Sequence, residues 1–92
     1  MIRSFRCKDT QALLEGGHPK RFRAIEMVAT RKLAMLDAAK TLDFTRSPPG
    51  NRLEALKGDR AGQWSVRIND QWRVCFVWTD AGPGEVEIVD YH

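Results

Sequence analysis

The sequence predicts an α+β fold, because a segment with helical periodicity precedes a group of strand-like segments. From Lys20 to Lys40 no residue breaks a helix, and apolar residues recur at near-helical spacing. From residue 63 onward apolar and polar residues alternate, as they do in half-buried strands. A length of 92 residues with 42% apolar content fits one domain, residues 1–92, with a modest core.

Two short elements are expected before the long helix. Residues 1–7, MIRSFRC, alternate in a β-prone run and predict a first strand. Asp9 or Thr10 can cap a short helix, which the pair Gly16-Gly17 ends.

The long helix, 20–40, is expected to pack on a sheet through one apolar stripe. This stripe consists of Phe22, Ile25, Ala29, Leu33 and Leu36. The other faces carry Arg21, Arg23, Arg31 and Lys32, which form either an ordinary solvated surface or a stripe that binds a partner.

A basic loop follows the long helix. Residues 48–51, PPGN, predict a stiff turn, and LEAL at 53–56 predicts a brief extended piece. The basic residues in or beside this loop are Arg46, Arg52, Lys57 and Arg60. The loop is either generically basic or a site where backbone N–H groups meet an anion, and its glycines match neither a P-loop nor a dinucleotide fingerprint.

The segment 63–78, QWSVRINDQWRVCFVW, predicts a hairpin with a three-residue loop at 69–71. This register gathers the apolar residues on one face, pairing Ile68 with Trp72, Val66 with Val74 and Trp64 with Phe76. The opposite face then pairs Ser65 with Cys75 and Arg67 with Arg73. Because two opposed arginines repel each other, either an anion or carboxylate lies between them or each pairs with a local acid such as Asp90.

The last segment, 85–92, predicts a strand antiparallel to its predecessor. Val86, Ile88 and Asp90 point to one face, and Val89 and Tyr91 to the other. The C-terminal residues therefore stand at a strand end near the basic hairpin face.

Charge and cysteine content narrow the class of protein. A formal net charge of +3 favours polyanionic partners only mildly. Cys7 and Cys75 form no CxxC motif and lack histidine neighbours, so we expect a reduced, cytoplasmic protein without metal. No signal-like run and no apolar stretch long enough to cross a bilayer occurs, which excludes a membrane-spanning role.

The polar residues near the C terminus suit one kind of chemistry. An imidazole, a carboxylate, a phenol, a lysine and arginines can assist RNA cleavage by its own 2′-hydroxyl, where protons move and a phosphorane is stabilised. A phosphate-binding module without activity accounts for the same arginines.

Three motifs in order, LKGDR at 56–60, INDQWRVCF at 68–76 and the closing DYH at 90–92, resemble the HigB branch of the RelE toxin superfamily. The resemblance covers the whole chain. It implies an α+β fold in which an N-terminal strand and two helices pack on one face of a small, mainly antiparallel sheet. It also implies the toxin of a type II toxin–antitoxin module, a ribosome-dependent endoribonuclease that cleaves translated mRNA in the decoding site of the small subunit. The implied partner is a HigA-like helix-turn-helix antitoxin, and no cofactor is implied.

Carried over by motif, the implied catalytic group is Lys57, Arg73, Asp90, Tyr91 and His92. His92 would transfer protons, Arg73 and Lys57 would stabilise phosphate charge, Tyr91 would stack on a base or assist proton transfer, and Asp90 would orient a basic partner. The implied RNA-binding residues are Arg67, Arg60 and Glu54. Some relatives have histidine where this chain has Glu54, so catalysis by two histidines is in doubt, and either Glu54 or His92 is the base.

Two other functions remain open from the sequence. A non-catalytic module that binds the ribosome or nucleic acid explains the basic face. A structural co-repressor that partners a DNA-binding antitoxin needs only the surface that meets it.

Overall fold

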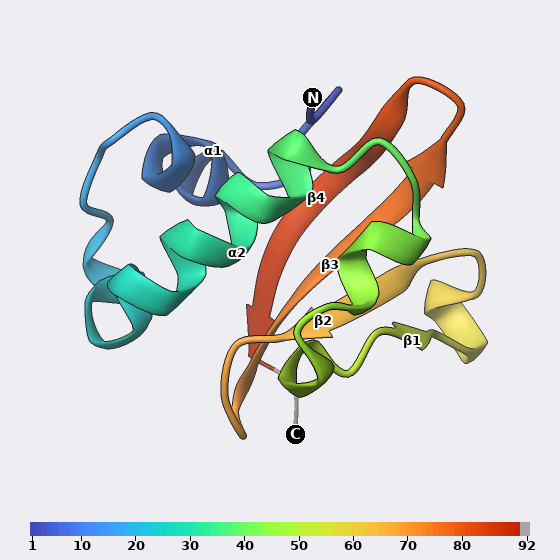
Figure 1. Cartoon of the computed structure of the whole chain (residues 1–92). Coiled ribbons are helices and arrows are strands. Elements are labelled where there is room, and N and C mark those ends of the chain that lie inside the picture. Colours follow the sequence, from blue (N-terminus) through green and yellow to red (C-terminus); the bar gives the residue numbers. More distant parts are fainter. Residues whose placement is uncertain (91–92) are drawn as a thin grey trace.

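The computed structural model describes residues 1–90, which form two helices and a four-stranded sheet (Figure 1). Short 3₁₀ segments, η1 to η4, connect these elements. In chain order the elements are α1 (Lys8–Leu14), η1 (Lys20–Ile25), α2 (Glu26–Ala38), η2 (Asp43–Arg46), η3 (Pro49–Asn51), β1 (Glu54–Ala55), η4 (Gly58–Arg60), β2 (Trp64–Arg67), β3 (Trp72–Thr79) and β4 (Gly82–Asp90). The α+β fold class is confirmed.

The sheet is antiparallel throughout, with strand order β1-β2-β3-β4. The β2–β3 register places Trp64, Ser65, Val66 and Arg67 opposite Phe76, Cys75, Val74 and Arg73, as the alternation predicts. Ile68 N also donates to Trp72 O (2.9 Å). In the loop, Asn69 Oδ1 accepts hydrogen bonds from the backbone N–H groups of Gln71 and Trp72, which closes the turn.

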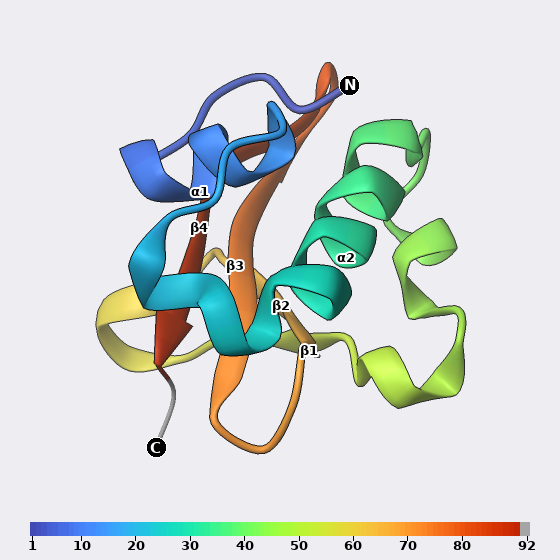
Figure 2. The ribbon, with the colours of Figure 1, turned by 90° about the vertical axis from the view of Figure 1, so that its left-hand side faces the viewer.

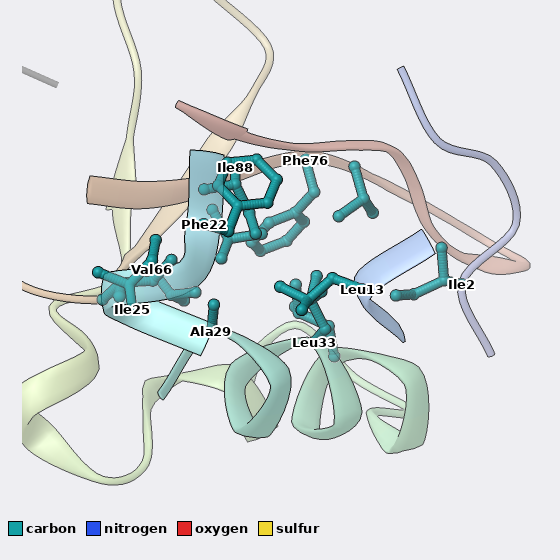
Figure 3. Packing of buried hydrophobic residues seen from close by; sticks show 13 residues of the cluster. Ile2, Leu13, Phe22, Ile25, Ala29, Leu33, Val66, Phe76 and Ile88 are labelled. Atoms are coloured by element: carbon teal, nitrogen blue, oxygen red, sulfur yellow. The ribbon is translucent and has the colours of Figure 1, made fainter. Parts of the chain in front are cut away.

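The helices cover one face of the sheet, and the core lies between these two layers (Figure 2). Figure 3 shows Leu13 and Leu33, from α1 and α2, beside each other in this space. Phe22 contributes a ring that meets Trp72 edge to face, with centroids 5.7 Å apart. The predicted helical stripe is confirmed, since its members Phe22, Ile25, Ala29, Leu33 and Leu36 are all buried.

The prediction of one continuous α-helix over 20–40 is wrong in its first third. Residues 20–25 form the 3₁₀ segment η1, and regular α-helix begins only at Glu26. The predicted burial of Phe22 and Ile25 is nevertheless correct, because both side chains face the core from the 3₁₀ segment.

The predicted helix caps Asp9 and Thr10 are also corrected. Both lie inside α1, whose N-cap residue is Cys7. The Thr10 hydroxyl is buried and accepts a hydrogen bond from Ile88 N (3.1 Å). Thr10 therefore ties α1 to the outer edge of β4. The predicted helix end is confirmed, because Gly16 leaves the helix with φ +95°.

The predicted N-terminal strand reduces to a single β-bridge, Phe5 with Val86, which is parallel. Arg6 N donates to Val86 O and Val86 N donates to Ser4 O, so this segment follows β4 without becoming a named strand. The start of α1 at Lys8 ends the pairing. Within residues 1–90, no helix is both long and apolar enough to pass through a membrane.

Candidate functional site

The strand register gathers a polar row on the sheet face that points away from the helices. Val66 and Val74 are buried toward the helices, so their neighbours along each strand point the other way. One row crosses all four strands as Glu54, Ser65, Cys75 and Glu87. The adjacent row consists of Arg67, Arg73 and Val89. These rows hold three of the candidate residues, Glu54, Arg67 and Arg73.

Arg73, the second residue of β3, lies on this face and is only 8% exposed. Its Nε donates to Ser65 Oγ (2.7 Å), and its Nη2 donates to the carbonyl oxygens of Arg52 (2.7 Å) and Ser65 (3.4 Å). The guanidinium is planar, so bonds from two directions fix its plane as well as its position. Arg73 is thus a buried, oriented cation.

Arg67, directly opposite Arg73, pairs instead with Asp70 of the hairpin loop. Arg67 Nη2 lies 2.5 Å from Asp70 Oδ1. A local acid therefore serves Arg67, as one of the two alternatives expected, although it is Asp70 and not Asp90. The two guanidinium groups diverge, since Arg73 turns toward the Arg52 carbonyl.

Arg60 lies beside the polar row in an ion pair with Glu87 (2.9 Å) and a hydrogen bond to Gln63 (3.1 Å). Glu87 also pairs with Arg6 of the N-terminal segment (3.8 Å). These contacts fix η4, the short turn that follows Lys57. Arg60 therefore supports the local structure in addition to any contact with RNA.

Glu54 and Lys57 lie on the exposed rim of the site. Neither makes a side-chain hydrogen bond or ion pair with another residue of the described part, 1–90. Glu54 is the strand partner of Ser65, the residue that holds Arg73 Nε. Opposed residues in a ladder have Cβ atoms about 5 Å apart, so a carboxylate stands next to the anchor of the buried arginine.

Asp90 points to the opposite face of the sheet from Arg73. It is the strand partner of Trp72, whose ring packs on Phe22 in the core. Asp90 is exposed at the end of β4, and its Oδ2 accepts a hydrogen bond from Gln71 Nε2 (3.0 Å). Tyr91 and His92, the other members of the expected catalytic group, lie outside the described residues.

Cys75 lies within the polar row but is fully buried. Burial raises the pKa of the Cys75 thiol, and Glu87 adds to this effect while Arg60 and Arg73 oppose it. The thiol therefore stays protonated near neutral pH and does not act as a nucleophile. Among residues 1–90, no three His, Cys, Asp or Glu side chains gather to hold a metal ion, and the site is an open surface without an enclosed pocket.

Sequence reasoning gave no role to two residues that the structure ties to the site. Ser65 is completely buried and binds Arg73. Asn51 is completely buried beside Arg52, and it accepts a hydrogen bond from Lys32 Nζ of α2. Burial lowers the pKa of Lys32, and the positive charges of Arg31 and Arg67 lower it further. The PPGN pattern predicted a turn at Asn51, but no local sequence pattern predicted which residues would bind its side chain.

Comparison with solved structures finds the same fold in a bacterial toxin. The YoeB/ParE toxin from Agrobacterium tumefaciens has a solved structure that superposes with a TM-score of 0.56, covering 99% of this chain and 98% of that one at 19% sequence identity. At that level of identity, the match establishes the fold alone.

The sequence comparisons define the family. Residues 4–92 match the model of the HigB-like toxins, described as the RelE-like toxin of type II toxin–antitoxin system HigB. Toxin HigB-1 of Vibrio cholerae serotype O1 is 47% identical over 57 residues, which are 62% of this chain and 60% of that protein. Endoribonuclease HigB of Proteus vulgaris is 30% identical over 94 aligned residues that span both chains completely. The chain belongs to the HigB-like toxin family of the RelE superfamily.

Proposed function

We propose that this chain is the toxin of a bacterial type II toxin–antitoxin module and acts as a ribosome-dependent endoribonuclease on translated mRNA. The observation that carries the proposal is the full-length similarity to a protein named Endoribonuclease HigB. The cationic and acidic groups on the helix-free sheet face support it, because they suit a phosphodiester substrate.

In the proposed reaction, the 2′-hydroxyl of the RNA attacks the adjacent phosphorus and the bond to the 5′-oxygen breaks. The base that removes the 2′-proton is Glu54 or His92, and the 5′-oxygen leaves with a proton from an acid in the site. Arg73 and Lys57 stabilise the charge on the phosphorane. Arg73 suits this task because its two described anchors hold the guanidinium in a fixed orientation before the substrate arrives.

The remaining candidates have supporting roles in this proposal. Arg67 and Arg60 contact the RNA backbone, Tyr91 stacks on a base or assists proton transfer, and Asp90 orients a basic neighbour. The metal-independent route needs no cofactor, since the nucleophile belongs to the RNA.

In this proposal the ribosome holds the RNA in the orientation that cleavage requires. The described part of the site has no enclosed pocket that could hold a nucleotide in one pose. Correct orientation of the reacting groups is worth several orders of magnitude in rate, and a message held in the decoding site of the small subunit is already positioned. A HigA-like helix-turn-helix antitoxin neutralises the toxin in the cytoplasm.

Inducible expression followed by mapping of mRNA 5′ ends tests this proposal. The expected result is growth arrest with new 5′ ends confined to translated reading frames. New ends spread equally over untranslated RNA would contradict ribosome dependence. Growth arrest without new ends would favour a non-catalytic ribosome-binding module, and neither effect would favour a structural partner of the antitoxin.

A further inference from the structure

Asn51 is a fully buried polar residue in the loop that precedes β1. Its Nδ2 lies 3.1 Å from the carbonyl oxygens of both Thr45 and Ser47, and 3.0 Å from Met35 Sδ. Its Oδ1 accepts a hydrogen bond from Lys32 Nζ. Because lysine only donates and carbonyls only accept, these partners fix which side of the amide faces which neighbour. The amide therefore cannot flip without breaking both sets of bonds.

The residue that follows Asn51 has an unusual backbone. Arg52 has φ +46° and ψ +60°. These angles lie in the left-handed region, which residues other than glycine rarely adopt. The turn before it is closed by Asn51 N to Pro48 O (2.9 Å) and Arg52 N to Pro49 O (3.2 Å). This conformation directs the Arg52 carbonyl toward β3, where it accepts the 2.7 Å hydrogen bond from Arg73 Nη2.

A continuous set of contacts thus joins α2 to Arg73. Lys32 binds the amide of Asn51, Asn51 holds the turn, and the next carbonyl along the chain binds Arg73. The second described anchor of Arg73, Ser65 Oγ, comes from the neighbouring strand. Without the Arg52 anchor, the described bonds of the guanidinium would be those to Ser65, of which the Nη2 bond is long at 3.4 Å, and these bonds would open more often.

We infer that Asn51 is a positioning residue, which orients the Arg73 guanidinium for the reaction through the carbonyl of Arg52. This inference rests on the proposed function of Arg73. Asn51 does not touch the substrate. Its effect is expected in the rate of the chemical step, because displacement of an oriented charge by about 1 Å can cost about a hundredfold in rate.

The test measures the position of Arg73 and the cleavage rate separately. In the NMR spectrum, the Nε–H signal of Arg73 is identified by its loss in Arg73→Lys. Asn51→Ala should speed hydrogen exchange of this Nε–H about tenfold or more, since the bond from Nε to Ser65 Oγ opens more often once the Arg52 anchor of the same guanidinium is weakened. With ribosome-bound mRNA, the same variant should lower kcat about tenfold to a hundredfold and leave KM within about threefold.

Thr45→Val is the matched control. Thr45 is equally buried, and within residues 1–90 its hydroxyl bonds only to Leu42 O (2.6 Å). Its backbone carbonyl, which accepts a hydrogen bond from Asn51, is retained in the variant. This variant should change neither the exchange of the Arg73 Nε–H nor kcat. If Asn51→Ala does not fold, Asn51→Asp keeps the side-chain volume and the acceptor for Lys32 while it removes the Nδ2 donor, and the same result is expected.

Unchanged exchange of the Arg73 Nε–H in a folded Asn51 variant would overturn the inference. So would an equal change in Thr45→Val, or faster exchange without loss of kcat. If the parent protein does not cleave RNA at all, the proposed function fails, whereas the NMR measurement still decides whether Asn51 holds Arg73 in place.

Discussion

Replacement of Arg73 by alanine should destabilise the fold, whatever its effect on RNA cleavage. Arg73 is 8% exposed and donates at least three hydrogen bonds, to Ser65 Oγ, Ser65 O and Arg52 O. A hydrogen bond to a charged group contributes about 1.5–3 kcal/mol, and buried acceptors left without donors add to the loss. The Ser65 O bond is long, so we expect the free energy of unfolding to fall by about 3 kcal/mol. For a domain of this size, the Tm would fall by roughly 12–24 °C.

Arg67→Ala is the control, because Arg67 is the strand partner of Arg73 and has the same chemistry. Its ion-pair partner Asp70 is fully exposed. An exposed ion pair contributes at most about 1 kcal/mol, so its loss should lower the Tm by no more than about 4–8 °C. Thermal melting and urea unfolding of both variants measure the difference. Equal Tm values for the two variants would refute the assignment of Arg73 as a buried, bonded cation. If the difference is found, growth assays of Arg73→Ala need a paired melt before any loss is attributed to catalysis.

Three further predictions concern the thiol, the C terminus and the rim of the site. Because burial raises the pKa of the Cys75 thiol, the unfolded state loses the thiol proton at a lower pH than the folded state does, so the free energy of unfolding should decline as pH rises past the thiol's ordinary value of 9.0. Urea titrations at several pH values measure this decline, and the absence of a decline relative to Cys75→Ala would contradict the prediction. Deletion of Tyr91 and His92 should lower cleavage by about 10²–10⁴ while the Tm stays near that of the parent, since the buried Ile88 precedes the cut; a truncated protein that still arrests growth would make His92 a bystander. Lys57→Met should reduce cleavage without lowering the Tm, since exposed Lys57 makes no side-chain bond with residues 1–90; full activity of this variant would remove Lys57 from the mechanism.

The hairpin shows what alternation can predict. The register of β2 and β3 followed from the sequence because a shift by one residue would have placed Arg73 opposite Val66 and mixed the two faces. Burial of one face therefore determines the register. From this register and that of β1, the polar row on the other face follows, including the position of Glu54 beside Ser65.

The N-terminal segment and the anchors of Arg73 could not be predicted in this way. Alternation in residues 1–7 is compatible with a strand, but pairing depends on where β4 lies and where α1 begins. Similarly, the burial of Arg73 depends on the carbonyl of Arg52, which the turn directs toward β3. The bond from Arg73 to Arg52 joins residues that are 21 positions apart, and local patterns contain no information about it.

The position of Asp90 shows a second limit of prediction from the sequence. Period-two alternation placed Asp90 on the face of Ile88, and the pairing of Asp90 with Trp72 agrees. The catalytic group expected from the sequence nevertheless combines Asp90 with Arg73, which points to the other face. If Asp90 and Arg73 act on the same substrate, the substrate must therefore reach past the end of β4, from one face of the sheet to the other.

Ribosome dependence is the central claim, and a reconstituted cleavage assay tests it most directly. The purified protein is incubated with one mRNA, either free in solution or held on ribosomes with a vacant decoding site, and the initial rates of cleavage are compared. We predict rapid cleavage of the ribosome-bound message within the codon in that site and, because positioning can contribute about 10⁵ or more in rate, no detectable cleavage of the free message in the same time. Equal rates on free and ribosome-bound mRNA would contradict the account.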